Sequence, residues 1–393
     1  MDFVVKEKTG IAIQEAVDAA YGCGGGRVVL EPGDYECVSI VLKSHVELHI
    51  PAGARIMASP NVEDYPDIVP RGLENVRPEK SQKCVISCAE AEGVSITGQG
   101  EINGRGPAFH DQNSTLYGTF WGRKPIPRPR MIQFFNCKNV TLEGITLRDA
   151  PSWTCWFTHC QDLNISRIRV LGNPKMINND GLDIDACNRV TVTDSFFDTG
   201  DDCIAIRAIR LSPKDTAICE NVFVSNCRLC TSCNCIRIGC PNDDTIRNII
   251  FSGLVIHGRG NGILCEAPPQ YLRKGEHGYM DVHNIQFTDC DIDCPWRAIT
   301  VCVARGIRLR GVHDFAFRNM NVRSGGNLLF QGNVNTVLEN ITLENIQGLV
   351  LSKQAIDVTY VRNFRMSNVC LTAEVGEEEP LPEAAGSSWE KAE

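Results

Sequence analysis

The stretches VTLEGITL (residues 140–147) and LNISRIRV (residues 163–170) show the pattern that decides the fold. In both, apolar and polar residues alternate, and a polar or glycine residue interrupts the alternation midway, as in two short β-strands separated by a turn. Similar stretches begin near residues 46, 94, 190, 222, 249, 285, 315, 337 and 361. The intervals cluster at roughly 22 to 30 residues, or about twice that where a repeat is skipped, so the pattern indicates a chain of repeated coils.

We therefore predict an all-β fold, a single-stranded right-handed parallel β-helix (solenoid), in which each coil pairs with the next. No helical periodicity separates the strands, which argues against a fold of alternating strands and helices. A β-propeller is the structural alternative, but its blades need about 40 residues. Within residues 10–24, apolar residues at helical spacing precede three glycines. This segment predicts a short N-terminal helix that caps the open end of the first coil.

Composition limits the classes of function. The net charge of −9 over 393 residues argues against nucleic acid or an anionic membrane surface as a partner. The first residues contain no apolar core of signal-peptide length, and no later run of about 20 apolar residues could span a bilayer. We expect a cytoplasmic protein whose oligomeric state is left open.

One β-helix domain is predicted over residues 1–373, followed by an acidic and mobile tail, residues 374–393.

The chain has 20 cysteines, which in a long intracellular protein are typical of buried thiols and not of disulfides. Cys227, Cys230 and Cys233 resemble the start of an iron–sulfur run. The interval to Cys240 is too long for that motif, and Cys235 intrudes. We expect core thiols here, with no metal and no cofactor.

Two acidic segments lie roughly one coil apart, NNDGLD (residues 178–183) and GDDCIAIR (residues 200–207). In a coiled chain, Asp180 and Asp183 would lie on one coil, beside Asp201 and Asp202 on the next. Neighbouring carboxylates can supply a protonated acid and an ionised base at the same pH. Two alternatives remain open at this point, a solvated acidic face and a calcium site.

Two insertions, residues 103–130 and 268–281, break the coil rhythm and are rich in polar and aromatic residues. Loops of this kind often form the walls of a binding site on a rigid scaffold. Trp121 and Tyr271 are candidates to stack on a sugar ring. Alternatively, both side chains pack the base of their loops.

Five ordered motifs resemble those of the polygalacturonase family, glycoside hydrolase family 28, and the similarity extends over about residues 10–370. The motifs lie at residues 98–106, 128–144, 150–154, 179–183 and 200–206. The resemblance implies a right-handed parallel β-helix and hydrolysis of glycosidic bonds with inversion. By position, Asp201 would be the general acid, while Asp180 and Asp202 would orient and deprotonate the attacking water. Asp183 would support the site or cap a turn.

The chain departs from the family pattern at two places. Asn234 stands where the family carries the histidine of a Gly-His-Gly motif, and an amide cannot titrate near neutral pH. Leu264, Cys265 and Glu266 stand where the family has Arg-Ile-Lys, whose cations hold a uronate carboxylate. Glu266 would repel that carboxylate. Arg237, Arg207 or Arg297 could supply a cation by another route, or each could be an ordinary arginine of a strand surface.

The sequence thus predicts an inverting glycoside hydrolase that acts on pectin-derived or related plant oligosaccharides and is not a standard polygalacturonase. Catalysis is assigned to Asp180, Asp201 and Asp202. Binding of the oligosaccharide is assigned to Asp183, Asn234, Arg237, Glu266, Trp121 and Arg207. Two alternatives are a calcium-dependent polysaccharide lyase and a carbohydrate-binding β-helix without catalytic activity.

Overall fold

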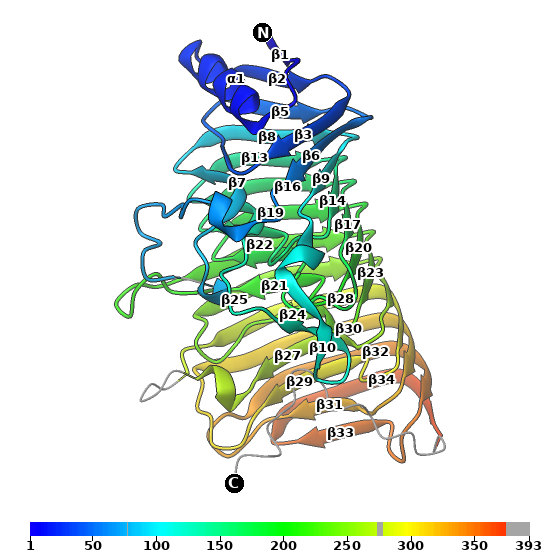
Figure 1. Ribbon diagram of the computed structural model, residues 1–393. Helices are drawn as coiled ribbons and strands as arrows, with labels where there is room; N and C mark the ends of the chain where they lie inside the picture. Colours follow the sequence, from blue (N-terminus) through cyan, green and yellow to red (C-terminus); the bar gives the residue numbers. More distant parts are fainter. Residues whose placement is uncertain (77, 273–277, 375–393) are drawn as a thin grey trace. The chain divides into compact units, whose positions relative to one another are not determined.

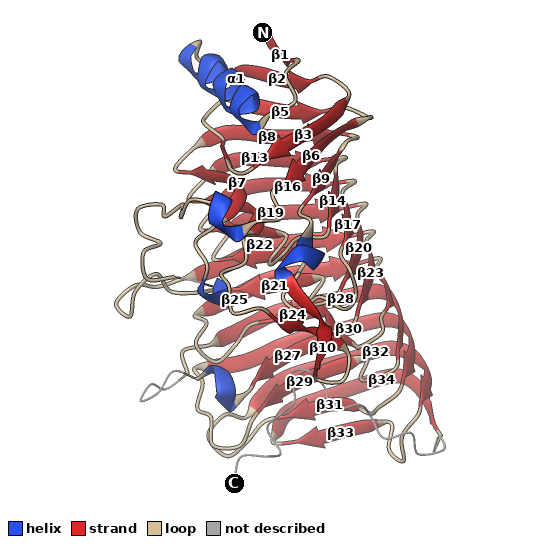
Figure 2. Ribbon diagram, viewed as in Figure 1, coloured by secondary structure: helices blue, strands red, loops and turns tan. Residues whose placement is uncertain are grey.

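The computed structural model describes residues 1–76, 78–272 and 278–374 of the chain (Figure 1). Strands dominate these residues, as Figure 2 shows, together with one α-helix and four 3-10 helices. The 3-10 helices are η1 (Val62–Asp64), η2 (Pro78–Lys80), η3 (Gly106–Phe109) and η4 (Pro269–Tyr271). The predicted tail lies outside the described residues from position 375 onward. In the described part of the chain, no helix has the length and apolarity needed to cross a membrane.

The described chain divides into two compact units, Met1–Asp201 (unit 1) and the described residues from Asp202 onward (unit 2). Each unit is described here by itself. The predicted extent of a single domain over residues 1–373 stays a prediction. Both units are built in the same way, because in each one short strands stack on their equivalents from neighbouring coils.

Unit 1 contains three parallel ladders, one for each side of the coil. The first comprises β1 (Asp2–Val5), β2 (Gly26–Leu30), β5 (Val46–Ile50), β8 (Glu92–Gly98), β13 (Lys138–Glu143), β16 (Gln161–Ser166) and β19 (Asn188–Thr193). The second comprises β3 (Gly33–Cys37), β6 (Ala54–Ala58), β9 (Glu101–Asn103), β14 (Thr146–Arg148), β17 (Arg169–Leu171) and β20 (Phe196–Thr199). The third comprises β4 (Ile40–Val41), β7 (Cys84–Ala89), β12 (Arg130–Phe135), β15 (Cys155–Thr158) and β18 (Leu182–Asp185).

Unit 2 repeats this arrangement. One ladder comprises β22 (Ile218–Ser225), β25 (Thr245–Ser252), β28 (Asp281–Cys294), β30 (Gly311–Ser324), β32 (Leu338–Val350) and β34 (Val361–Ala373). The strands β23 (Arg228–Thr231) and β26 (Val255–His257) pair with each other, and β26 pairs with the second half of β28. The other ladder comprises β21 (Ile204–Arg207), β24 (Asn234–Ile238), β27 (Asn261–Ala267), β29 (Ile299–Val303), β31 (Leu328–Gln331) and β33 (Ile356–Thr359).

The core follows from the alternation in the sequence. Val140 and Leu142 are buried, and they are the register partners of the buried residues Leu163 and Ile165 on the next coil. Since successive side chains of a strand point to opposite faces, alternate residues fill the interior while the others face outward. In unit 2 the rings of Phe251 and Phe287 stack with their centroids 4.5 Å apart. The predicted fold class, a right-handed parallel β-helix, is confirmed.

The N-terminal helix α1 (Gly10–Gly22) confirms the predicted cap and ends two residues before the expected boundary at 24. The hydroxyl of Thr9 accepts a hydrogen bond from the N–H of Ala12 at 3.2 Å, as an N-cap residue does. Gln14 accepts from the N–H of Val41 at 2.7 Å and donates to its carbonyl oxygen at 3.1 Å. The helix therefore satisfies backbone groups of β4, which is an edge strand of unit 1.

Asparagines mark a repeated corner of the coils in unit 2. Asn221, Asn248 and Asn284 have φ angles of 56°, 57° and 54°, a left-handed conformation that asparagine tolerates better than most residues. Their side chains form a line of amides, since Asn248 donates to Asn221 at 3.2 Å and Asn284 donates to Asn248 at 2.8 Å. The corner is thereby held in the same place on successive coils.

The cysteines of both units are free thiols, and most are buried. Cys227 and Cys235, from the cluster that superficially resembles an iron–sulfur run, lie in the core of unit 2. The thiol of Cys227 donates to the carbonyl oxygen of Ser225 at 3.2 Å. These two cysteines therefore pack as small apolar side chains.

Candidate active site

In unit 1, the side chain of Asn179 links the two acidic segments by hydrogen bonds. This fully buried amide accepts hydrogen bonds from the N–H groups of Gly200 and Asp201, both at 2.9 Å. The N–H of Asn178 donates to Oδ2 of Asp201 at 2.8 Å. A Cβ atom at Gly200 would lie 2.1 Å from the carbonyl oxygen of Met176. Glycine is therefore required for the close approach that brings Asp201 to the segment carrying Asp180.

Asp180 and Asp183 differ in their surroundings. Asp180 precedes β18 and is 6 % exposed, and its carbonyl oxygen accepts from the N–H of Thr154 at 2.8 Å. Asp183 lies within β18, is fully buried, and is the register partner of Trp156. This position suits a residue that supports its neighbours. Direct contact of Asp183 with a sugar stays a prediction that this burial does not favour.

Arg128 contacts Asn178, the residue whose N–H donates to Asp201. Sequence analysis had assigned no role to this arginine. Its guanidinium donates to the carbonyl oxygen of Ile177 and to Oδ1 of Asn178, both at 2.7 Å. It also pairs with Glu79 at 3.3 Å. Burial lowers the pKa of Arg128, and the charges of Glu79, Asp201 and Asp180 partly offset that fall. The buried cation thus fixes the turn that supplies the hydrogen bond to Asp201.

His110 completes this network. Its Nε2 lies 3.1 Å from Nη1 of Arg128, which can only donate, so Nε2 accepts and Nδ1 carries the proton. Nδ1 then donates to the carbonyl oxygen of Gly106 at 3.1 Å. Burial lowers the pKa of His110 to about 4. The ring is therefore neutral at neutral pH, and it orients Arg128.

Trp121 lies on a hairpin of unit 1 formed by β10 (His110–Leu116) and β11 (Phe120–Arg123). The backbone N–H of Trp121 donates to the carbonyl oxygen of Lys175 at 2.7 Å. This hydrogen bond holds the hairpin against the segment that leads to Asp180. The indole is partly exposed. Stacking of Trp121 on a sugar stays a prediction.

In unit 2, Asp202 is held by a chain of amides. Asn234 donates to Oδ1 of Asp202 at 2.6 Å and accepts from Nδ2 of Asn261 at 3.0 Å. The Oδ1 of Asn261 in turn accepts from the N–H of Arg297 at 3.2 Å. Asn234 and Asn261 are register partners on β24 and β27, so the parallel ladder itself aligns the two amides. The residue that replaces the family histidine is therefore bonded directly to a predicted catalytic carboxylate.

Arg237 and Glu266 form a buried pair in the same unit. They are about 6 % exposed each, and Nη1 of Arg237 lies 3.6 Å from Oε2 of Glu266. Arg237 also donates to the carbonyl oxygens of Gly239 and Glu266, both at 3.2 Å. Burial raises the pKa of Glu266, while the charges of Arg237 and Arg297 lower it. Arg237 thus partly neutralises the charge of Glu266 that would repel a uronate carboxylate. The sequence alone did not reveal this pairing.

The remaining predicted ligands in unit 2 have other contacts. Arg207 forms a two-pronged pair with Asp243, at 2.8 and 3.2 Å, and the Asp243 side chain is 2 % exposed. The ring of Tyr271 lies 5.9 Å from the guanidinium of Arg237. A direct role of Arg207 in binding substrate stays a prediction.

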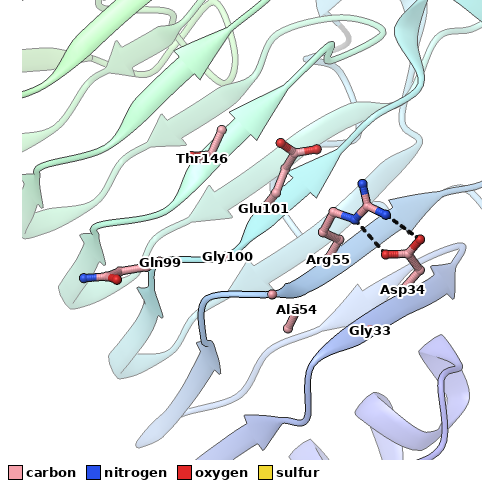
Figure 3. Close-up of a pocket in the computed structure, with 9 residues that line it drawn as sticks. Gly33, Asp34, Ala54, Arg55, Gln99, Gly100, Glu101 and Thr146 are labelled. Carbon is pink, nitrogen blue, oxygen red and sulfur yellow. Dashed lines mark hydrogen bonds and ion pairs between the residues drawn. The ribbon is translucent and has the colours of Figure 1, made fainter.

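A groove of about 650 Å³ lies elsewhere in unit 1, along β3, β6 and β9 (Figure 3). Its two carboxylates are each bonded to an arginine, Asp34 to Arg55 at 2.7 Å and Glu101 to Arg148 at 2.9 Å. None of the predicted catalytic residues lines it. The groove is therefore separate from the predicted catalytic residues.

Comparison with known proteins agrees with the motifs. Residues 73–212 match the family model described as glycosyl hydrolases family 28. The chain is 29 % identical over 204 residues to a probable polygalacturonase of Arabidopsis thaliana, covering 46 % of this chain and 42 % of that protein. It is 23 % identical over 317 residues to an exopolygalacturonase of Zea mays, covering 79 % and 71 %. The chain thus spans less than half of the length of the Arabidopsis relative.

Solved structures share the fold. A hyperthermoactive exopolygalacturonase from Thermotoga maritima superposes with a TM-score of 0.75 at 18 % identity, covering 97 % of this chain and 93 % of that one. An endo-xylogalacturonan hydrolase from Aspergillus tubingensis superposes with a TM-score of 0.60 at 16 % identity, covering 95 % and 93 %. The family match over residues 73–212 includes the motifs at residues 179–183 and 200–206, so this part of the chain is similar to glycoside hydrolase family 28.

Proposed function

We propose that this protein is a member of glycoside hydrolase family 28, an inverting hydrolase that acts on oligosaccharides derived from pectin or a related plant polymer. The observation that carries the proposal is the turn organised by Asn179. It holds Asp201 by backbone hydrogen bonds next to the segment that bears Asp180. A carboxyl group held in this way has a fixed direction, which general acid catalysis requires.

In the proposed mechanism, Asp201 protonates the oxygen of the leaving sugar. Asp180 and Asp202 orient the attacking water and remove its proton. The hydrogen bond from Asn234 fixes the direction of the Asp202 carboxylate, as the hydrogen bond from Asn178 does for Asp201. An inverting hydrolase needs about 6.5 to 9.5 Å between its acid and its base, which leaves room for the water.

We further propose that the sugar at the cleavage point is neutral. Leu264 and Glu266 provide no cation where the family binds a uronate carboxylate. Two cations lie near Glu266. Arg237 is buried and paired with Glu266, and Arg297 donates to Oδ1 of Asn327 at 3.0 Å. A uronate at this position would have to compete with Glu266 for Arg237, which would weaken its binding.

Free thiols throughout the described chain support a reducing compartment, such as the cytoplasm, as the place of action.

The test is hydrolysis of a panel of pectic oligosaccharides, neutral and uronic, with the configuration of the new anomeric centre followed by NMR. We expect inversion, a preference for a neutral sugar at the cleavage point, and a loss of about 100-fold to 10,000-fold in kcat for Asp201→Asn. Asp162→Asn is the matched control, because this carboxylate pairs with Arg189 on the surface of unit 1. It should keep full activity.

Three outcomes would contradict the proposal. Full activity of Asp201→Asn would refute the assignment of the acid. An unsaturated product that requires calcium would identify a lyase. Binding of the oligosaccharides without turnover of any of them would identify a carbohydrate-binding protein.

A further inference from the structure

Two histidines and one aspartate lie together on a ladder of unit 2 that does not carry Asn234. Asp281 and His283 are at the start of β28, and His313 is the register partner of His283 on β30. Oδ1 of Asp281 lies 3.3 Å from Nδ1 of His283 and 3.7 Å from Nε2 of His313. One ligand atom from each residue lies within 4.8 Å of the other two. In a tetrahedral zinc site with bonds of about 2.0–2.1 Å, ligand atoms are about 3.3–3.4 Å apart, so the donor atoms are already close to this spacing.

Asp314 sets the orientation of one of these ligands. Its Oδ2 lies 2.6 Å from Nδ1 of His313, and its Oδ1 accepts from Asn340 at 2.7 Å. A neutral His313 that donates its Nδ1 proton to Asp314 has a lone pair on Nε2, which faces Asp281. A carboxylate that receives the second ring proton is the usual partner of a metal-binding histidine.

The local charge favours a divalent cation. Asp281 and Asp314 place two carboxylates against the two imidazoles. Two nearby arginines already have carboxylate partners. Arg247, on the neighbouring strand β25, pairs with Glu220 at 2.7 Å, and Arg362, on β34 beyond β32, pairs with Glu339 at 3.0 Å. A bound divalent cation would neutralise the two remaining carboxylates.

The absence of a side chain at Gly311 leaves space beside two of the ligands. Gly311 is the register partner of Asp281, and a Cβ atom there would lie 3.0 Å from Oδ1 of Asp281 and 3.1 Å from Cδ2 of His313. The two rings are parallel, with their centroids 4.9 Å apart. Asp314 holds the ring of His313, so the ring of His283 must turn about its Cβ–Cγ bond to bind the same ion, a torsion with broad minima. The ring of His283 is partly exposed, so this rotation meets little resistance.

We propose that Asp281, His283 and His313 bind one Zn²⁺ ion, with Asp314 as the carboxylate that positions His313. Imidazole nitrogen together with carboxylate oxygen is a common ligand set for zinc, and water would fill the fourth position. The ion would link β28 to β30. Its role would be structural, because the proposed hydrolysis assigns no step to it.

The experiment is titration of the full-length protein with ZnCl₂ by calorimetry at pH 7.5. Cys23→Ser and Cys370→Ser form the background, since these are the exposed thiols of the described residues. We expect one zinc ion per chain. His313→Gln and His283→Gln should each weaken binding at least about 10-fold, and Asp314→Asn about 10-fold to 100-fold. Gly311→Ala should weaken binding although it removes no ligand. Binding should fall at pH 5.5, where protonated histidines cannot coordinate zinc.

His257→Gln is the matched control. Nε2 of this histidine lies 3.0 Å from Asp291, also in unit 2, and it belongs to no group of three possible ligands in the described chain. The control should bind zinc as the background protein does. Unchanged zinc affinity in the double variant of His283 and His313, or an equal loss in the control, would overturn the proposal. A thermal stability that responds to pH but not to ZnCl₂ would also overturn it, since the cluster would then bind protons only.

Discussion

At the scale of single residues, Asn234 shows how an amide can take the place of a titratable ring. It donates to Asp202 and is itself held by Asn261, so its orientation is fixed from both sides. The sequence predicted that asparagine occupies the position of the family histidine. It could not show the hydrogen bond to Asp202, because the two residues are 32 positions apart.

We expect Asn234→Ala to lower kcat/KM about 10-fold to 100-fold, because a hydrogen bond to a charged group contributes about 1.5–3 kcal/mol. Steady-state kinetics on the best substrate of the panel provides the measurement. Asn248→Ala is the control, since this asparagine lies in the exposed line of corner amides. Equal kinetics for both variants would show that Asn234 does not position Asp202.

A second prediction at this scale concerns acid. The pKa of His110 is lowered from 6.5 to about 4 by burial. Above pH 6.5 the ring is neutral in both the folded and the unfolded chain, and it adds no pH dependence. Between pH 6.5 and 4 the unfolded chain binds the proton while the folded chain does not, so the free energy of unfolding falls by up to about 3 kcal/mol.

The test of this acid sensitivity is His110→Gln, in which the amide can still accept from Arg128 and donate to Gly106. Urea denaturation at pH 7 and pH 4.5 should show a smaller loss of stability on acidification in this variant than in the native protein. An identical pH dependence in the His110 variant and the native protein would contradict the assignment.

At the scale of elements, a charged side chain buried on one strand can pair with an opposite charge on the neighbouring strand. Arg237 on β24 and Glu266 on β27 are both buried. Arg237→Met should cost about 3–5 kcal/mol at neutral pH, because it leaves a buried carboxylate without its cation. The cost should shrink at acidic pH, where Glu266 is protonated. The double variant with Glu266→Met should be more stable than the sum of the single changes predicts.

Urea denaturation of the native protein, the two single variants and the double variant completes this thermodynamic cycle. KM for neutral and uronic substrates should be measured on the same variants. This measurement separates the effect of the pair on stability from any effect on substrate selection. Additive free energies would show that Arg237 and Glu266 do not interact.

The strand pattern was predictable because every coil buries alternate side chains, so burial is visible in the spacing of apolar residues. Strand 138–143 and strand 161–166 lie where the alternation predicted them. The network of His110 and Arg128 was not predictable, because its partners come from separate loops and have no periodic signal. Glu79, 49 positions from Arg128, is an example. The hairpin around Trp121 was expected only as an insertion, since its register depends on turn geometry.

At the scale of the whole molecule, the N-terminal cap determines whether the first coil remains covered. Val17 is fully buried on the inner side of α1, whereas Ile11 on the same helix is 73 % exposed. We expect Val17→Asp to detach the helix, expose the edge strand β4 and cause concentration-dependent association, measured by light scattering. Ile11→Asp is the control and should behave as the native protein does. Absence of association in the Val17 variant would show that other residues protect this edge.

The line of asparagine amides along the corners of unit 2 limits how the length of such a chain can change during evolution. Each amide reaches only the equivalent corner above or below it, so a gene duplication that adds a whole coil extends the line without breaking it. An added residue within a strand would displace every later corner and turn core side chains toward water. Relatives of this protein should therefore differ in length by complete coils, or by loops that leave the ladder between strands.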